Sequence, residues 1–223
     1  MGALGPLLTI ARKDFLLELR NRDILVSLVV FAMLVLIIFN FAIELTAVNL
    51  DALGPGILWV AIAFAGVIGL NRTFVLEKDH DALDGLMLAP VSRDTIFLGK
   101  ALGSMGFILL SELVIFPVFA ALFGVDILRL ETLAVALLAS LGLAAAGTVF
   151  GAMAVSTRSR EIMLPVLFLP VISPVLIGAV EATARVASGA SWSAVSQWLQ
   201  IIAVFDLVFV VAGVLLFQYV LED

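Results

Sequence analysis

The stretch ALGSMGFILLSELVIFPVFAALF, residues 101–123, contains a single ionisable side chain, Glu112. A helix of about 20 mostly apolar residues is long enough to cross the hydrocarbon core of a bilayer. The stretch therefore predicts a transmembrane helix. Five further stretches have a similar length and character, at residues 24–43, 55–71, 132–155, 162–180 and 199–221. We expect an all-α membrane protein with six transmembrane helices in one domain, residues 1–223.

The composition excludes a water-soluble fold. Hydrophobic residues make up 63% of the 223 positions and charged residues 13%, whereas roughly a quarter of the residues in soluble domains are charged. A surface with so few polar side chains must face lipid. The chain has no cysteine, which excludes disulfides and thiolate metal sites. Its one histidine, His80, cannot form a metal site alone.

The positions of lysine and arginine predict the orientation, because cytoplasmic loops carry an excess of positive charge. Two of the twelve, Arg129 and Arg185, follow the third and fifth predicted helices. The other ten precede the first helix or lie in the loops after the second and fourth: Arg12, Lys13, Arg20, Arg22, Arg72, Lys78, Arg93, Lys100, Arg158 and Arg160. This distribution predicts that both termini are cytoplasmic.

Two segments have the amphipathic pattern of helices that lie on a membrane surface. Residues 7–22 place Leu8, Ala11, Phe15 and Leu19 near one face, and Arg12, Lys13, Glu18 and Arg20 largely on the other. Before the last span, apolar residues recur at helical spacing among serine and glutamine: Trp192, Val195, Trp198, Leu199 and Ile202. We expect a cytoplasmic surface helix at residues 7–22 and a short outer surface helix before the last span.

The sequence lacks the motifs of catalytic and nucleotide-binding sites. Gly99 and Lys100 are followed by Ala101 and are not preceded by the earlier glycine of a P-loop. There is no H-E-x-x-H pair and no G-x-S-x-G elbow. We therefore expect a chain that does not itself bind ATP, is not an enzyme and has no nucleic acid partner.

Two acidic residues fall within predicted spans, where an acidic side chain at the helix centre costs about 2.5–3.5 kcal/mol on insertion scales. Glu112 lies near the middle of residues 101–123. It fits either a functional contact with substrate or protons, or a hydrogen bond between helices. Asp206 is expected nearer the membrane interface, where it would cap a helix or pair with a loop. Both residues are candidates for an intramembrane polar site.

The most polar loop, residues 71–100, contains a short amphipathic segment that ends at Pro90. Its apolar patch is formed by Leu83, Leu86 and Met87, flanked by Glu77, Asp79 and Asp84, with Arg93 beyond. A short helix of this kind can dock into a groove of a soluble partner. The alternative is a further helix on the membrane surface, although such helices favour a basic polar face.

Several segments resemble the heme exporter protein B family (CcmB). They are ARKDFLLELRNRD at residues 11–23, GPGILWVAIAFAGVIGLNRTF at 54–74, LMLAPVSRDTIFLGK at 86–100, TRSREIMLPVLFLPVISPVLIGAVEAT at 157–183 and FDLVFVVAGVLLFQYVLED at 205–223. The PG-x-x-W pattern from Pro55 and the RE-x-x-LP-x-x-x-x-P pattern from Arg160 are more specific than hydropathy. The resemblance covers most of the chain.

The resemblance implies an ABC-2-like permease of the bacterial cytoplasmic membrane that acts in heme export and cytochrome c maturation. Two copies would pair with two copies of a separate ATPase, alongside a heme-handling membrane protein and a heme chaperone. The segment from Glu77 to Leu88 resembles a coupling helix, through which ATP hydrolysis would drive release of the heme-loaded chaperone.

The chain itself is not expected to ligate heme. Its candidate iron ligands are His80, Tyr219 and scattered methionines. The complex would handle heme, and ATP would bind the partner. Two alternatives stay open: an ABC-2-type exporter of lipid, polysaccharide or drug, and a channel or scaffold subunit that needs no nucleotide.

Overall fold

A computed structural model describes residues 4–20, 22–44, 50–79, 85, 88–155 and 160–220. This part of the chain forms seven helices: α1 (Leu4–Arg20), α2 (Arg22–Glu44), α3 (Leu50–Asp79), α5 (Arg93–Phe123), α6 (Leu130–Val155), α7 (Arg160–Ala187) and α8 (Trp192–Val220). The six helices from α2 onward are long and apolar enough to cross a membrane. The predicted all-α fold with six transmembrane helices is therefore confirmed.

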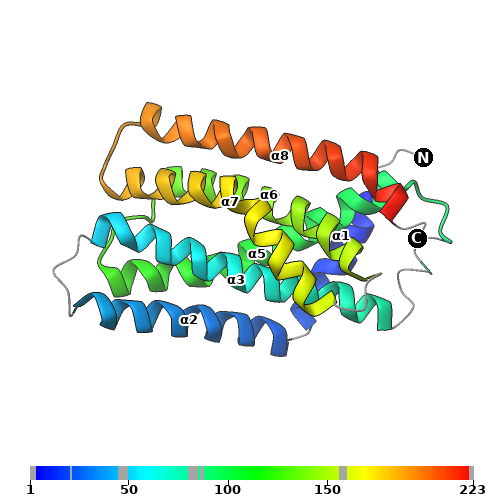
Figure 1. The fold of residues 1–223 in the computed structure, drawn as a ribbon, viewed down its shortest axis with the longest axis horizontal. Helices are drawn as coiled ribbons and strands as arrows, with labels where there is room; N and C mark the ends of the chain where they lie inside the picture. Colours follow the sequence, from blue (N-terminus) through cyan, green and yellow to red (C-terminus); the bar gives the residue numbers. More distant parts are fainter. Residues whose placement is uncertain are drawn as a thin grey trace.

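The long helices lie side by side, with α1 at one end of the bundle (Figure 1). We call this the α1 end. Helix α6 packs against α3, α5, α7 and α8, and 67% of its span is buried, compared with 22% for α2 and α8. Its small residues explain this central place, because they let neighbouring helices approach closely. A Cβ at Gly147, for example, would overlap Leu70 of α3.

Helix α1 packs closely against the first half of α5. Three glycines of α5 face it, at positions 99, 103 and 106. A Cβ at Gly99 would lie 2.8 Å from the Ile10 Cβ, and one at Gly103 would lie 2.9 Å from the Asp14 Cβ. These positions lie three to four residues apart and therefore share one face of α5.

The described residues of the predicted N-terminal surface helix are helical, but its faces differ from those predicted. Glu18, expected on the polar face, is buried, as are Ile10 and Asp14, whereas Leu8 is 61% exposed. The prediction from the sequence pattern was that lipid would cover the apolar face. The structure covers a mixed face with α5 instead, because the glycines there let α1 approach.

The residues of the predicted short outer surface helix are helical, but they are continuous with the last span. Residues 192–202 form the first turns of α8, which continues to Val220. Residues 192–212 contain no glycine or proline, so nothing interrupts the backbone hydrogen bonds. Polar residues before the last span therefore mark the end of a long helix.

Candidate functional site

The predicted coupling segment is flanked by two helix ends at the α1 end of the bundle (Figure 1). Helix α3 continues to Asp79, so Glu77 and Asp79 belong to its last turn. Arg93 is the first residue of α5. The other predicted coupling residues lie outside the described part of the chain: Leu83, Asp84, Leu86 and Met87. Their role stays a prediction.

The residues just before α5 expose one further apolar side chain. Leu88 is 87% exposed, and the chain turns directly after it, where the Val91 amide donates to the Ala89 carbonyl at 2.8 Å. The apolar patch predicted from the sequence stops at Met87, although the segment that resembles a coupling helix extends to Leu88. The signal was present, since Leu88 follows Leu86 and Met87 in an apolar run.

The first turns of α5 are fixed between α1 and α8. The Phe97 ring is fully buried and lies 5.5 Å from the ring of Phe217 in α8. Both belong to an apolar cluster that includes Ile10 of α1. A Cβ at Gly213 of α8 would overlap the Phe97 ring, which shows how closely the two helices meet. The first turns of α5 are therefore packed against both neighbouring helices.

A buried ion pair adds to this contact. The Lys100 Nζ atom lies 3.6 Å from the Asp14 Oδ2 atom, and both side chains are at most 4% exposed. Lys13 also contacts this carboxylate, at 2.8 Å. From the sequence, Lys100 counted as a cation of a cytoplasmic loop. The structure instead places it inside α5, because this helix begins at Arg93, two turns before the predicted start.

Glu112 lies on α5 where this helix faces α6. The side chain is 1% exposed. Its Oε1 atom accepts a hydrogen bond from the Ser140 hydroxyl of α6 at 3.0 Å, and its Oε2 atom has no hydrogen-bond partner. The hydrogen bond between helices, one of the two interpretations of Glu112 from the sequence, is therefore present. The oxygen without a partner is also compatible with the other interpretation, a contact with a ligand.

A groove of about 520 Å³ runs between α5 and α6 beside Glu112. Phe15 of α1 lines it at one end and Arg129 at the other. Buried residues form its floor: Glu112, Phe116, Thr132 and Ala136. Exposed leucines form its walls: Leu113, Leu128, Leu133 and Leu137. The Thr132 hydroxyl also has no hydrogen-bond partner, so the floor holds two unsatisfied polar atoms in apolar surroundings.

Arg129, at the groove end away from α1, is engaged by a neighbour. Its Nη2 atom donates to the Asp126 Oδ2 atom at 2.6 Å. This hydrogen bond, together with the negative charge of Asp126, raises the pKa of Arg129. The guanidinium therefore has its countercharge within the loop between α5 and α6.

The expected position of Asp206 near the membrane interface is wrong. The residue lies near the middle of α8 and is 3% exposed. It neither caps a helix nor pairs with a loop, since both carboxyl oxygens lack a hydrogen-bond partner. Its carboxyl group packs against Gly142 of α6, close to Val175 of α7. The prediction failed because α8 begins at Trp192, which moves Asp206 away from the helix end.

The two intramembrane carboxyl groups do not form one site. Glu112 bonds to Ser140 and Asp206 packs against Gly142. These α6 residues are two positions apart and therefore point roughly 200° away from one another. Helix α6 thus lies between the carboxyl groups. In the described part of the chain, no group of three or more His, Cys, Asp or Glu side chains could hold a metal ion.

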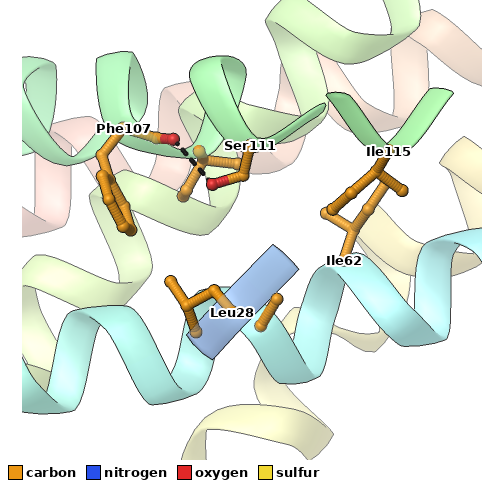
Figure 2. Close-up of a pocket in the computed structure, with 8 residues that line it drawn as sticks. Leu28, Ile62, Phe107, Ser111 and Ile115 are labelled. Carbon is orange, nitrogen blue, oxygen red and sulfur yellow. Dashed lines mark hydrogen bonds between the residues drawn. The ribbon is translucent and has the colours of Figure 1, made fainter. Parts of the chain in front are cut away.

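A second cavity lies between α2, α3 and α5, and Figure 2 shows residues that line it. Its volume is about 10 Å³. The Ser111 hydroxyl in its wall already donates to the Phe107 carbonyl at 3.1 Å. One water needs roughly 10–15 Å³ and two to four polar partners. This cavity is therefore too small and too apolar for a ligand.

Comparison with known proteins finds one family over nearly the whole chain. The profile of the CcmB family, described as CcmB protein, matches residues 6–220. The heme exporter protein B of Bradyrhizobium diazoefficiens is 30% identical over 190 residues, which cover 85% of this chain and 84% of that protein. The protein of the same name from Pseudomonas aeruginosa is 29% identical over 180 residues, 79% of this chain and 80% of that protein. That from Rhodobacter capsulatus is 29% identical over 160 residues, with coverage of 71% and 73%.

Proposed function

The chain belongs to the CcmB family, and we propose that it acts in a bacterial membrane as the permease of a heme exporter that serves cytochrome c maturation. A CcmB permease is a transporter subunit and not a catalytic chain. The family implies an ABC transporter complex with a separate ATPase subunit. The match over residues 6–220 carries the proposal, and it favours heme export over the lipid, polysaccharide, drug, channel and scaffold alternatives.

The ATPase docks at the α1 end, onto the segment between α3 and α5. Two described features support this position. Leu88 presents an apolar side chain that is 87% exposed, as a docking surface requires. The segment also joins the ends of two membrane-spanning helices, Asp79 of α3 and Arg93 of α5, so a force on it reaches both. The basic residues favour the cytoplasmic side for this end.

Helix α5 passes this force to the bundle. Its first turns are packed against α1 through Gly99 and Gly103 and against α8 through Phe97. A rigid contact of this kind moves as a unit, because close-packed interfaces transmit strain. ATP hydrolysis would therefore shift α1, α5 and α8 together. The movement serves release of a heme-loaded chaperone, in a complex of two copies of the chain, two ATPases and a heme-handling membrane protein.

An aspartate scan of leucines tests the docking position. In Leu86→Asp and Leu88→Asp, we expect at least about a tenfold loss of ATPase co-purification and of c-type cytochrome yield, because a charge in an apolar anchor costs about 1.4 kcal/mol or more. Leu130→Asp is the matched control, since Leu130 is 81% exposed at the opposite end of the bundle. Membrane insertion should be normal in all three.

Three outcomes would contradict parts of the proposal. Normal ATPase binding in the Leu86 and Leu88 variants would remove the docking position and leave heme export standing. Deletion of the chain tests heme export itself. Retention of c-type cytochromes, with a drug or surface-polymer defect, would indicate another exporter. Full activity beside an ATPase with a disabled Walker motif would indicate a channel or scaffold.

A further inference from the structure

The groove between α5 and α6 has polar atoms on its floor that nothing in the described chain satisfies. These are the Glu112 Oε2 and Thr132 Oγ1 atoms, on side chains that are 1% and 3% exposed. A buried polar atom without a partner destabilises a fold, and folded proteins leave few such atoms. The two residues line the same groove, which indicates that a ligand bound there supplies the missing hydrogen bonds.

We infer that this groove binds a membrane-dissolved amphiphile, an alkyl or isoprenoid chain with a hydroxyl group that donates a hydrogen bond to Glu112. The walls are leucine side chains that are 41–70% exposed, such as Leu113 and Leu137. They face outward from the bundle, so a ligand enters sideways from the lipid. The apolar chain contacts these walls, and the hydroxyl reaches the floor.

The size of the groove selects a small molecule over a protein helix. Its volume of about 520 Å³ falls within the usual range of small-molecule sites, roughly 300–1,000 Å³. A transmembrane helix about 10 Å wide and 30 Å long occupies on the order of 2,000 Å³ or more. The groove could not enclose such a helix, whereas its volume suits one small molecule.

The polar atoms select a neutral donor over an anionic headgroup. Glu112 offers a carboxyl oxygen, which accepts a hydrogen bond from a neutral donor and brings no positive charge to an anion. Arg129 is engaged by Asp126 at 2.6 Å. Apolar walls also penalise a charged amine. A hydroxyl can donate to Glu112 without bringing a charge into the groove.

The separation of the two polar atoms also predicts the distance between two polar groups of the ligand. Thr132 precedes Ser140, the α6 partner of Glu112, by eight residues, which is about 12 Å along a helix. A ligand that reaches both therefore carries a second polar group about 12 Å from its hydroxyl, at the Arg129 end of the groove. The site is separate from the docking segment at the α1 end and does not depend on the proposed function.

Photolabelling tests the inference on the full chain in phospholipid nanodiscs, together with its ATPase. The probe is hexadecanol with a diazirine at mid-chain, and the matched control probe is its methyl ether, which cannot donate. We expect the alcohol to label residues 106–113 and 132–137 about tenfold more than the ether does, as the loss of about 1.4 kcal/mol of binding predicts. Glu112→Leu should abolish this preference.

Two tryptophan variants test the groove independently, in case the Glu112 variant does not fold. Leu137→Trp fills the groove and should reduce labelling about tenfold. Leu207→Trp should leave labelling unchanged, because Leu207 lies on the outer face of α8, where its side chain is 65% exposed. Equal labelling by alcohol and ether would overturn the inference, because the groove would then hold ordinary lipid. Labelling that ignores Leu137→Trp, or that is confined to other lipid-facing helices, would also overturn it.

Discussion

The two halves of α5 differ in how their buried ionisable side chains are paired. At the α1 end, Lys100 and Asp14 lie 3.6 Å apart beneath closely packed helices. In the middle, Glu112 has one oxygen bonded to Ser140 and the other without a partner beside a groove. A paired, enclosed charge contributes to a fixed contact, whereas a carboxyl group with one unpartnered oxygen at a groove leaves a place for a ligand. The same helix therefore supplies a rigid connection and a binding surface.

Removing the cation at the α1 end should have the largest effect. In Lys100→Met the alkyl stem is kept but the buried Asp14 carboxylate loses one of its cations, which we expect to lower the free energy of unfolding by about 3 kcal/mol. Unfolding in mixed micelles by SDS, followed by tryptophan fluorescence, measures this change. The companion variant Asp14→Leu in the same background should restore much of the loss.

The exposed pair of Asp126 and Arg129 provides the control. Its side chains are 69% and 38% exposed, so Arg129→Met should leave unfolding unchanged. Equal stability of Lys100→Met and the unmodified protein would show that the buried pair does not fix α1 to α5.

Widening the contact between α1 and α5 should have an intermediate effect. Gly103→Val would place its Cβ 2.9 Å from the Asp14 Cβ and 3.2 Å from the Ala11 carbonyl oxygen. We expect about 2 kcal/mol of destabilisation from this overpacking, with easier proteolysis of α1. Gly66→Ala in α3 is the control, because its Cβ would meet nothing within 4 Å. Similar effects of the two variants would mean that glycine contributes through helix propensity alone.

The smallest effect should come from the hydrogen bond in the middle of the bundle. A double-mutant cycle of Glu112→Leu and Ser140→Ala should give a coupling of about 0.6 kcal/mol, typical of hydrogen bonds between transmembrane helices. Asp206→Asn should leave unfolding unchanged or stabilise the protein, since neither oxygen of Asp206 has a partner to lose. A coupling near zero would mean that Glu112 does not stabilise the contact between α5 and α6.

The sequence alone determined the six spans, the amphipathic N-terminal helix and the presence of Glu112 within a span. These features depend on composition and on the 3.6-residue period, which are local properties of the chain. The family resemblance also followed from residues adjacent in sequence, such as the PG-x-x-W pattern from Pro55.

Only the tertiary structure decided which face of each helix is buried and what each buried charge meets. Hydropathy placed Lys100 in a loop and Asp206 near an interface, because it carries no information on where long helices end or which neighbours cover them. The role of the glycines at positions 99 and 103 depends on α1, which packs directly against them. The groove beside Glu112 likewise depends on the spacing between α5 and α6, which contacts between residues distant in sequence determine and no local pattern encodes.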